Sequence, residues 1–273
     1  MPQRKRSRSA ATTPAARGSS SARRASSQPR LRDSTRGTGP AGRAHPRSSS
    51  RGSTPGEIER LIRSQPWSTL EPLVATCHDP AGALARLRAM ASLIINWNRT
   101  SSNVMSRHDE SRIVERHMAE SLAPATWIGE TGLRSWVDFG SGAGFPAIPL
   151  AVAGIGERWL LVESRRTKAL FLRRVVQELE SKGIAVENAR LEALATPGPF
   201  GGFTARATVD APRTLALAAS LVEPGGSAFL WKGSRLGDEL ERDRTWQALW
   251  SLDRVMPISA NQAVVARFIR TAR

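Results

Sequence analysis

The spacing of apolar residues changes character along the chain. Between residues 55 and 134, apolar positions recur every three or four residues, which is typical of amphipathic helices. A short helix is expected after Pro55, a long one from Pro80 to Asn98, and another from Asp109, a good N-cap residue, through Leu122. The apolar stripe of the long helix consists of Leu84, Leu87, Met90, Leu93, Ile94 and Trp97. This pattern predicts an N-terminal helical region over 55–134.

From residue 135 onward, short apolar runs alternate with helical patterns. Strands are expected at 136–139, 159–163, 184–186, 204–209, 227–231, 252–258 and 263–269. Helices are expected between them at 146–152, 168–180, 215–221 and 237–249. Repeated strand–helix units predict an α/β domain over 135–273 with a doubly wound, mostly parallel sheet. The last two strands have no helix between them, so we expect an antiparallel C-terminal edge strand.

The first 54 residues differ from the rest in composition and charge. They hold 13 of the 40 Lys and Arg residues but one of the 24 acidic residues, Asp33, and their only leucine is Leu31. Such a segment cannot bury enough apolar surface to offset the entropy lost on ordering, so we expect a disordered, basic, low-complexity tail over 1–54. Three interpretations stay open: an inert solvated extension, an arm that attracts RNA phosphates, and an organelle transit peptide.

Composition excludes several classes of protein. The single cysteine, Cys77, excludes an intrachain disulfide framework and any metal site built from several cysteines. His45, His78 and His108 have no metal-ligand partners at useful spacing, so no metal site is expected. No apolar run approaches 18 residues, so we expect no membrane partner. Tyrosine is absent, which excludes mechanisms that need a phenol.

The most informative segment is DFGSGAGFP, residues 138–146. A buried strand leads into a turn in which Gly140, Gly142 and Gly144 alternate with other residues. Glycine permits positive φ and lets a ligand approach the main chain closely. In an open parallel sheet, ligands bind beyond the carboxyl ends of the strands, at the point where the strand order reverses. We therefore expect this loop to bind a cofactor that contains adenosine.

Spacing alone leaves the cofactor open. The pattern D-x-G-x-G-x-G is typical of S-adenosylmethionine-dependent methyltransferases, whereas residues 142–147 also match the dinucleotide pattern G-x-G-x-x-A. In either case Glu163, which ends the second strand, is expected to accept hydrogen bonds from ribose hydroxyls. Methyl transfer is favoured because there is no Tyr for a Tyr-Lys hydride-transfer site, and because Asp138 can hold the loop or the amino-acid end of S-adenosylmethionine. A turn whose glycines serve packing only is the remaining interpretation.

Several further blocks, from about Leu84 to the C-terminus, carry a resemblance. They are Trp97-Asn98 with Asn103-Val104, Ile113–His117 with Glu120–Leu122, Asp138–Leu150, Glu163-Ser164 with Lys168 and Phe171-Leu172, Arg190–Glu192, Ala205–Ala207, and Pro224–Gly226 with Lys232-Gly233. Together they resemble the 16S ribosomal RNA guanine-N7 methyltransferases, also called glucose-inhibited division protein B (RsmG). The most specific block, DFGSGAGFPAIPL, is close to the family's DVGSGAGFPGIPL. Glu120, Ala147 and Leu191 depart from the family's usual Asp, Gly and Ala.

The resemblance implies a Rossmann-like class I methyltransferase fold and S-adenosyl-L-methionine as the cofactor. It also implies small-subunit ribosomal RNA or the assembled small ribosomal subunit as the partner, and a cytoplasmic location; we expect a monomer. It places Gly140 and Phe145 against the cofactor, Leu191 and Glu192 beside the adenine, and Arg206 nearby. With the residues of the loop and the ribose partner, the expected cofactor-binding residues are Asp138, Gly140, Gly142, Phe145, Glu163, Leu191, Glu192 and Arg206.

Guanine N7 carries a lone pair and no proton, so it can attack the methyl group of the sulfonium without a general base. We therefore expect no catalytic acid or base, only alignment of the reacting atoms. The residues expected to face RNA are Arg116, His117, Arg165, Arg166 and Lys232. His117 lies on the apolar face of its helix and fits a structural histidine equally well. Two other functions stay open: a nicotinamide-dependent Rossmann oxidoreductase, and a non-catalytic RNA-binding protein on a methyltransferase fold.

Overall fold

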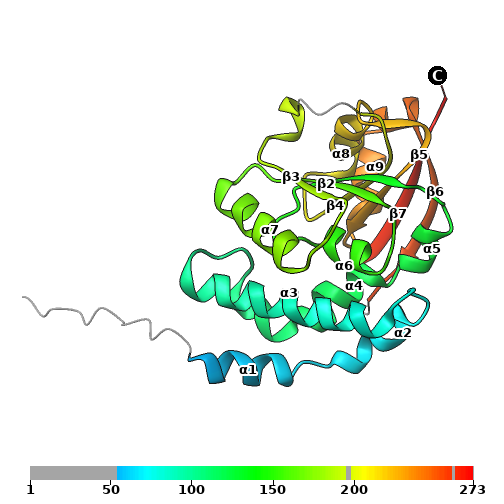
Figure 1. Cartoon of the computed structure of the whole chain (residues 1–273). Coiled ribbons are helices and arrows are strands. Elements are labelled where there is room, and N and C mark those ends of the chain that lie inside the picture. Colours follow the sequence, from blue (N-terminus) through cyan, green and yellow to red (C-terminus); the bar gives the residue numbers. More distant parts are fainter. Residues whose placement is uncertain (1–53, 195–197, 260–261, 273) are drawn as a thin grey trace, which may run out of the picture. The chain divides into compact units, whose positions relative to one another are not determined.

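A seven-stranded sheet forms the centre of the structure, a computed structural model that describes residues 54–194, 198–259 and 262–272 (Figure 1). The tail expected over 1–54 lies outside these residues except for Thr54. The strands are β1 (Ser135–Phe139), β2 (Arg158–Val162), β3 (Ile184–Glu187), β4 (Phe200–Arg206), β5 (Val222–Lys232), β6 (Trp250–Pro257) and β7 (Val264–Arg270). Their order across the sheet is β3-β2-β1-β4-β5-β7-β6.

The first five strands pair in parallel, whereas β7 runs antiparallel to both of its neighbours, β5 and β6. Strand β1 pairs with β2 on one side and β4 on the other, so the strand order reverses at β1. These pairings confirm the predicted mostly parallel α/β sheet. The predicted C-terminal edge strand is wrong in one respect: β7 is antiparallel, but it lies inside the sheet and β6 forms the edge.

Alternate residues of each strand point to opposite faces of the sheet, and both faces are buried at the central strands β1, β2 and β4. In β2, Trp159 and Leu161 pack in one apolar cluster with residues of α3 (Pro80–Thr100), α6 (Ala147–Val152) and α7 (Arg166–Glu178). Leu160 and Val162 pack in a second cluster with residues of α8 (Ala211–Ala218) and α9 (Leu236–Arg242). Burial on both faces explains why this strand is apolar at nearly every position. The predicted doubly wound arrangement is therefore confirmed.

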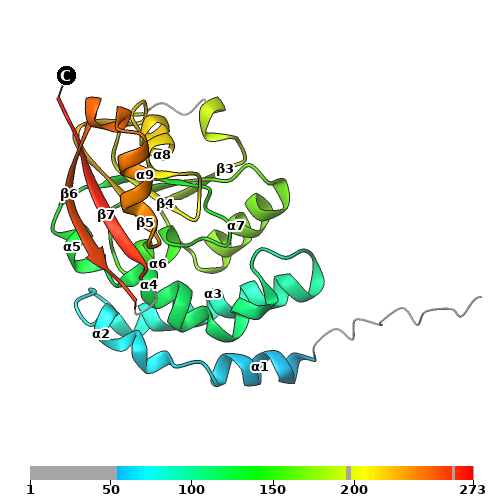
Figure 2. The ribbon, with the colours of Figure 1, turned by 180° about the vertical axis from the view of Figure 1, so that it is seen from behind.

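Helices cover both faces of the sheet. They are α1 (Pro55–Arg63), α2 (Glu71–Val74), α3 (Pro80–Thr100), α4 (Glu120–Leu122), α5 (Ala125–Gly129), α6 (Ala147–Val152), α7 (Arg166–Glu178), α8 (Ala211–Ala218) and α9 (Leu236–Arg242). Figures 1 and 2 show α1, α2 and α3 gathered along one side of the sheet, away from α8 and α9. Asp79 is the N-cap of helix α3, and its carboxylate accepts a hydrogen bond from the N–H of Gly82 at 2.9 Å. This N-cap and the apolar stripe fix the long helix close to where the sequence predicts it.

The segment expected as one helix from Asp109 is irregular. It starts as a 3₁₀ helix, η2 (Arg107–Arg112), with Ser106 rather than Asp109 at its N-cap, continues as a π-helix, η3 (Ile113–Ala119), and ends in the single turn of α4. The reason lies in Glu110, whose side chain is 2% exposed and accepts a hydrogen bond from Nδ2 of Asn98 at 2.8 Å. Arg99 also pairs with this carboxylate at 2.7 Å. Because a buried carboxylate needs partners, its bonds to α3 override regular helical geometry.

Strand β4 begins four residues earlier than predicted, at Phe200, and ends at Arg206 rather than at residue 209. The sequence pattern does not predict this start, because Gly201 and Gly202 have a low propensity for strands. A Cβ on Gly202 would lie 2.2 Å from Cε3 of Trp136 on the neighbouring β1, so the tryptophan requires glycine there. Helix α8 likewise begins before the predicted 215, because Asp210 caps it through a hydrogen bond from the N–H of Arg213 at 2.9 Å.

The helix predicted over 237–249 is shorter than expected. Helix α9 stops at Arg242, and a 3₁₀ turn, Thr245–Ala248, leads into β6.

In the part of the chain that the structure describes, no helix combines the length and apolar character needed to cross a bilayer.

Candidate functional site

The glycine loop, residues 140–146, joins β1 to α6 at the carboxyl edge of the sheet. Gly140, Gly142 and Gly144 have φ angles of 69°, 58° and 95°, a region that residues with a Cβ rarely adopt. The N–H groups of Gly140 and Ser141 donate to the main-chain oxygen of Val162, in β2, at 2.9 and 3.2 Å. The loop is therefore held against the end of β2 by its own main chain.

The three glycines have different reasons to lack a side chain. A Cβ on Gly144 would lie 2.5 Å from Cδ1 of Ile148, so packing against α6 requires this glycine. A Cβ on Gly140 would meet Cγ2 of Thr208 at 3.3 Å, and the nearest atom to one on Gly142 would be the main-chain oxygen of Gly140 at 3.6 Å. Gly140 and Gly142 thus leave their main chain accessible to a ligand, which a purely structural turn does not require.

Asp138, near the end of β1, is fully buried. Its Oδ1 accepts a hydrogen bond from the hydroxyl of Thr204 at 2.6 Å, whereas its buried Oδ2 has no hydrogen-bond partner among the described residues. Burial raises the pKa of Asp138 to about 7; the hydroxyls of Ser141 and Thr204 oppose the rise, and the charge of Glu163 adds to it. An unpartnered buried oxygen is costly, so Oδ2 marks a position where a hydrogen-bond donor or a cation would bind favourably.

Glu163 faces the glycine loop, as its spacing predicts. Its side chain is 6% exposed, its Oε2 accepts a hydrogen bond from the N–H of Gly142 at 3.0 Å, and its Oε1 accepts one from the N–H of Arg165 at 2.7 Å. Asn188, which follows β3, donates through Nδ2 to the main-chain oxygen of Glu163 at 2.8 Å. These bonds fix the carboxylate beside Gly142, and each oxygen keeps a second lone pair for a hydroxyl donor.

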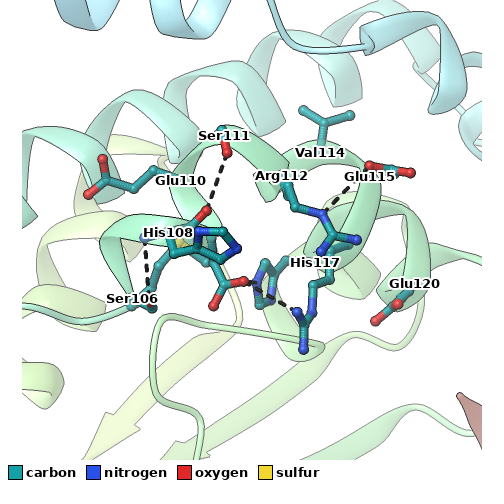
Figure 3. A network of polar contacts seen from close by, with 12 residues as sticks. Ser106, His108, Glu110, Ser111, Arg112, Val114, Glu115, His117 and Glu120 are labelled. Atoms are coloured by element: carbon teal, nitrogen blue, oxygen red, sulfur yellow. Dashed lines mark hydrogen bonds and ion pairs between the residues drawn. The ribbon is translucent and has the colours of Figure 1, made fainter. Parts of the chain in front are cut away.

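His117 lies beside the glycine loop, with its ring 5.3 Å from the ring of Phe145, centroid to centroid. Figure 3 shows it among the polar side chains of η2 and η3, including Arg112 and Glu115. Burial and, to a smaller extent, the positive charge of Arg206 lower the pKa of His117 to about 4. The imidazole is therefore neutral at pH 7. A π-helix is an uncommon element that occurs often at functional sites, and here it carries this histidine to the loop.

Arg206, the last residue of β4, is directed toward the helical region. Its guanidinium donates to the main-chain oxygens of Arg116 at 3.0 Å and His117 at 3.3 Å, and it pairs with the carboxylate of Glu120. The arginine side chain is 15% exposed and the glutamate 12%. This cluster joins η3 and α4 to the sheet, so Arg206 fixes the position of His117 relative to the glycine loop.

A cavity of about 480 Å³ opens where β4 and β5 end. Its lining includes Arg116, Glu120, Arg206, Ala207, Thr208, Trp231, Lys232 and Glu239. The cavity adjoins the glycine loop, because Thr208 also contacts the Cβ position of Gly140. Three residues that the sequence predicts near the cofactor or RNA, namely Arg116, Arg206 and Lys232, therefore share one cavity beside the loop.

The remaining predicted residues lie in different surroundings. Leu191, in the short 3₁₀ turn Leu191–Ala193, is buried in an apolar cluster, whereas Glu192 is exposed. Arg165 and Arg166 are exposed at the start of α7, two and three residues after Glu163. The N–H of Arg165 donates to Glu163, which in turn contacts the glycine loop, whereas the Leu191 side chain lies in the core.

Sequence reasoning missed three residues that position this site: Thr204, Asn188 and Glu239. A hydroxyl in the middle of a buried apolar strand is a signal for Thr204, because a buried polar group needs a partner. No sequence signal identifies Asn188, which bonds to Glu163, 25 residues away, or Glu239, which pairs with Lys232 on a different element. Among the described residues, no three His, Cys, Asp or Glu side chains are grouped so that they would hold a metal ion.

Comparison with known sequences gives a consistent result. The sequence profile of the family described as "rRNA small subunit methyltransferase G" matches residues 83–264. The Ribosomal RNA small subunit methyltransferase G of Xanthomonas axonopodis pv. citri (strain 306) is 35% identical over 186 residues, which are 68% of this chain and 84% of that protein. The protein of the same name from Halorhodospira halophila (strain DSM 244 / SL1) is 34% identical over 173 residues, 63% of this chain and 79% of the relative. These matches confirm the resemblance of the sequence blocks.

Comparison with solved structures supports the fold. Magnesium protoporphyrin IX methyltransferase from Synechocystis PCC 6803, solved with bound SAM, superposes with a TM-score of 0.50. The match covers 67% of this chain and 97% of the other, at 14% sequence identity. At this identity the similarity shows a shared methyltransferase-type fold and nothing about the substrate.

Proposed function

This chain belongs to the rRNA small subunit methyltransferase G family, and on that premise we propose that it transfers a methyl group from S-adenosylmethionine to N7 of a guanine in small-subunit ribosomal RNA. The names of the relatives supply the kind of RNA. The resemblance of the sequence blocks supplies the base and the atom. The observation that carries the proposal is the glycine loop, with an accessible main chain at Gly140 and Gly142 beside the unpartnered Oδ2 of Asp138.

The residues around the loop fit the proposed cofactor. The amino-acid end of S-adenosylmethionine carries an ammonium group, and Asp138 Oδ2 is a buried acceptor that lacks a partner among the described residues. Its ribose carries two hydroxyls, and the Glu163 carboxylate is fixed at the neighbouring strand end. We assign Phe145 to the wall of this site, together with Gly140 and Gly142. In this assignment Leu191 and Glu192 flank the adenine through their main chain, because the Leu191 side chain is buried.

The proposed reaction needs little acid–base chemistry from the protein. S-adenosylmethionine supplies an electrophilic methyl group on a sulfonium, and guanine N7 supplies the lone pair. The chain's own contribution is alignment and electrostatics. His117 stays neutral at pH 7, so it adds no positive charge next to the site where positive charge moves onto the purine. Arg206 serves as a positioning residue, because it holds η3 against β4.

We propose that the helical region 55–134 and the sheet domain 135–273 act together on RNA. Arg116 and Arg165 are exposed near the loop, and we assign them to phosphate contacts, since phosphate contacts position a protein on nucleic acid. Within this proposal the chain acts as a monomer on ribosomal RNA or the small subunit, in the cytoplasm where ribosomes are assembled. The tail 1–54 is proposed to strengthen RNA binding at low salt without affecting cofactor binding.

Methyl transfer tests the proposed function directly. The full chain is incubated with tritiated S-adenosylmethionine and with small ribosomal subunits, or their RNA, from a strain that lacks this protein. The RNA should then contain labelled 7-methylguanosine, identified by mass spectrometry. Two results would contradict the proposal. Tight binding of NAD with no affinity for S-adenosylmethionine would favour an oxidoreductase. Binding of the RNA with no methylation by the protein, and unchanged guanine methylation in the strain, would favour a non-catalytic RNA-binding protein.

Cofactor affinity should depend on pH through Asp138. Its pKa of about 7 means that the carboxyl is mostly protonated at pH 6 and mostly ionised at pH 8. The ionised form attracts the cofactor's ammonium, so affinity should rise about tenfold between pH 6 and 8 and level off above that range. Isothermal titration calorimetry at a series of pH values measures this effect. His117 does not contribute, because its pKa is about 4.

The Asp138→Asn variant provides the control for this prediction. It removes the titrating group while Thr204 can still donate to the amide oxygen, so the pH dependence should disappear and the affinity at pH 8 should fall. Asp138 also affects stability: since its folded-state pKa is raised above the usual 3.8, the wild type should lose stability as the pH rises from about 4 to about 7. A wild-type cofactor affinity that is constant from pH 6 to 8 would refute the assignment of Asp138 to the ammonium.

A further inference from the structure

The cavity at the ends of β4 and β5 has the features of a built ligand site. Its volume of about 480 Å³ lies in the range of about 300–1,000 Å³ found for small-molecule pockets. It is lined by Ala207, whose φ of 52° is a conformation that residues with a Cβ rarely adopt. Such strain persists where the surrounding structure enforces it, and it is frequent at ligand sites. The cavity also adjoins the glycine loop through Thr208.

A partly buried ion pair lies in the wall of this cavity. Lys232, the last residue of β5, pairs through Nζ with Oε2 of Glu239, on α9, at 2.9 Å, and the two side chains are 10% and 18% exposed. Lys232 Nζ also donates to the main-chain oxygen of Val209 at 2.7 Å, and Glu239 Oε2 also accepts from the N–H of Ala211 at 2.8 Å. These structural bonds occupy two of the three ammonium protons and only one carboxylate oxygen. Glu239 Oε1 has no hydrogen bond to a described residue.

The pair therefore offers a donor directly beside an acceptor at the cavity wall. We propose that Lys232 and Glu239 recognise the target guanine, with the ammonium donating to O6 and Oε1 accepting from both N1–H and the N2 amino group. This inference rests on the proposed function. Adenine has the same N7 lone pair, but it presents an amino donor at C6 where the Lys232 ammonium needs an acceptor. It also presents an acceptor at N1 where Glu239 Oε1 needs a donor. Selection of guanine over adenine then comes from this pair and not from the reacting atom.

The position of the pair in the sheet agrees with this assignment. Strand β4 lies between β1, which carries the glycine loop, and β5, which carries Lys232. A purine held at Lys232 and Glu239 therefore spans β4 and has its N7-bearing edge available on the side of the glycine loop. Arg206 and Glu120, on the same cavity, neutralise each other's charge, so the interior does not attract phosphate indiscriminately.

The test compares bases that differ in the proposed contacts. Inosine keeps O6 and N1–H but lacks the N2 amino group, and adenosine lacks the whole pattern. The substrate that the methyl-transfer assay identifies, RNA or reconstituted subunit, is prepared with guanosine, inosine or adenosine at the modified position. The wild type should prefer guanosine to inosine by about tenfold in kcat/KM and should not methylate adenosine detectably, because unpaired polar groups in a hydrogen-bonding site are strongly disfavoured.

The Glu239→Gln variant should lower the guanosine rate by about tenfold or more and bring the guanosine-to-inosine ratio close to one, with unchanged S-adenosylmethionine affinity. The matched control is Glu241→Gln, the same change at an exposed position of the same helix, which should leave rate and ratio unchanged. If Glu239→Gln lowers the rates on guanosine and inosine equally, the inference is wrong. It is also wrong if the wild type does not distinguish guanosine from inosine, a result that does not depend on whether Glu239→Gln folds. A wild type that binds the RNA but never methylates guanosine rejects the proposed function itself.

Discussion

Replacing Gly140 with valine is expected to weaken S-adenosylmethionine binding by more than about 100-fold. Three effects combine. The φ of 69° at Gly140 is unfavourable for a β-branched residue by roughly 1–2 kcal/mol, and the new side chain would meet Thr208, whose Cγ2 lies 3.3 Å from the Cβ position. The side chain would also occupy the accessible space that we assign to the cofactor. Isothermal titration calorimetry measures the affinity, and thermal unfolding shows whether the variant is folded.

The chain offers a matched control for this change. Gly132 has a φ of 65°, almost the same as Gly140, but nothing lies within 4 Å of its Cβ position. Gly132→Val should therefore lose a similar amount of stability without losing cofactor affinity. If both valine variants bind the cofactor as tightly as the wild type, the glycine loop is a structural turn and the cofactor assignment is wrong.

Replacing Arg206 with alanine is expected to lower the free energy of unfolding by about 3–5 kcal/mol. The variant leaves the carboxylate of Glu120 buried without its partner and removes the hydrogen bonds to the main-chain oxygens of Arg116 and His117. Because these bonds join η3 to β4, methyl transfer should fall as well. Urea-induced unfolding measures the change in stability.

A second substitution separates the two causes of this loss. Adding Glu120→Gln to Arg206→Ala removes the uncompensated charge, so part of the stability should return while activity stays low. Arg134→Ala is the control, since Arg134 pairs with Glu157 at an exposed position where an ion pair contributes little. A loss no larger than that of the control would show that Arg206 does not anchor the helical region.

Local sequence patterns predicted most of the fold, because most helices and strands are determined by residues that lie close together in the sequence. The apolar runs of β1 and β2, the stripe of α3 and the glycine loop each follow from residues within a few positions of one another. The elements that differ have distant causes. Strand β4 has Gly202 near its start because Trp136 leaves no room for a side chain there, and η2 departs from a regular helix because Glu110 binds α3.

The same distinction between local and distant causes applies to the residues of the candidate site. The position of Glu163 beside the loop could be predicted, since it depends on two neighbouring strand ends. The direction of the Arg206 side chain could not, because its partners on η3 and α4 lie 86 to 90 residues away along the chain. Glu239 was missed for a different reason: Lys232 is only seven residues away but lies on another element, and no local pattern shows that the two side chains meet.

The place of β7 in the sheet has a consequence for how the protein is made. Its residues, Val264–Arg270, are translated after those of every other strand, yet they insert between β5 and β6. Until they leave the ribosome, the nascent chain must keep an open edge on β5, and the buried Phe268 and Val265 are not yet available to fill the core. An open apolar edge is prone to pairing with other chains, so we expect the chain to be most prone to aggregation before β7 is in place.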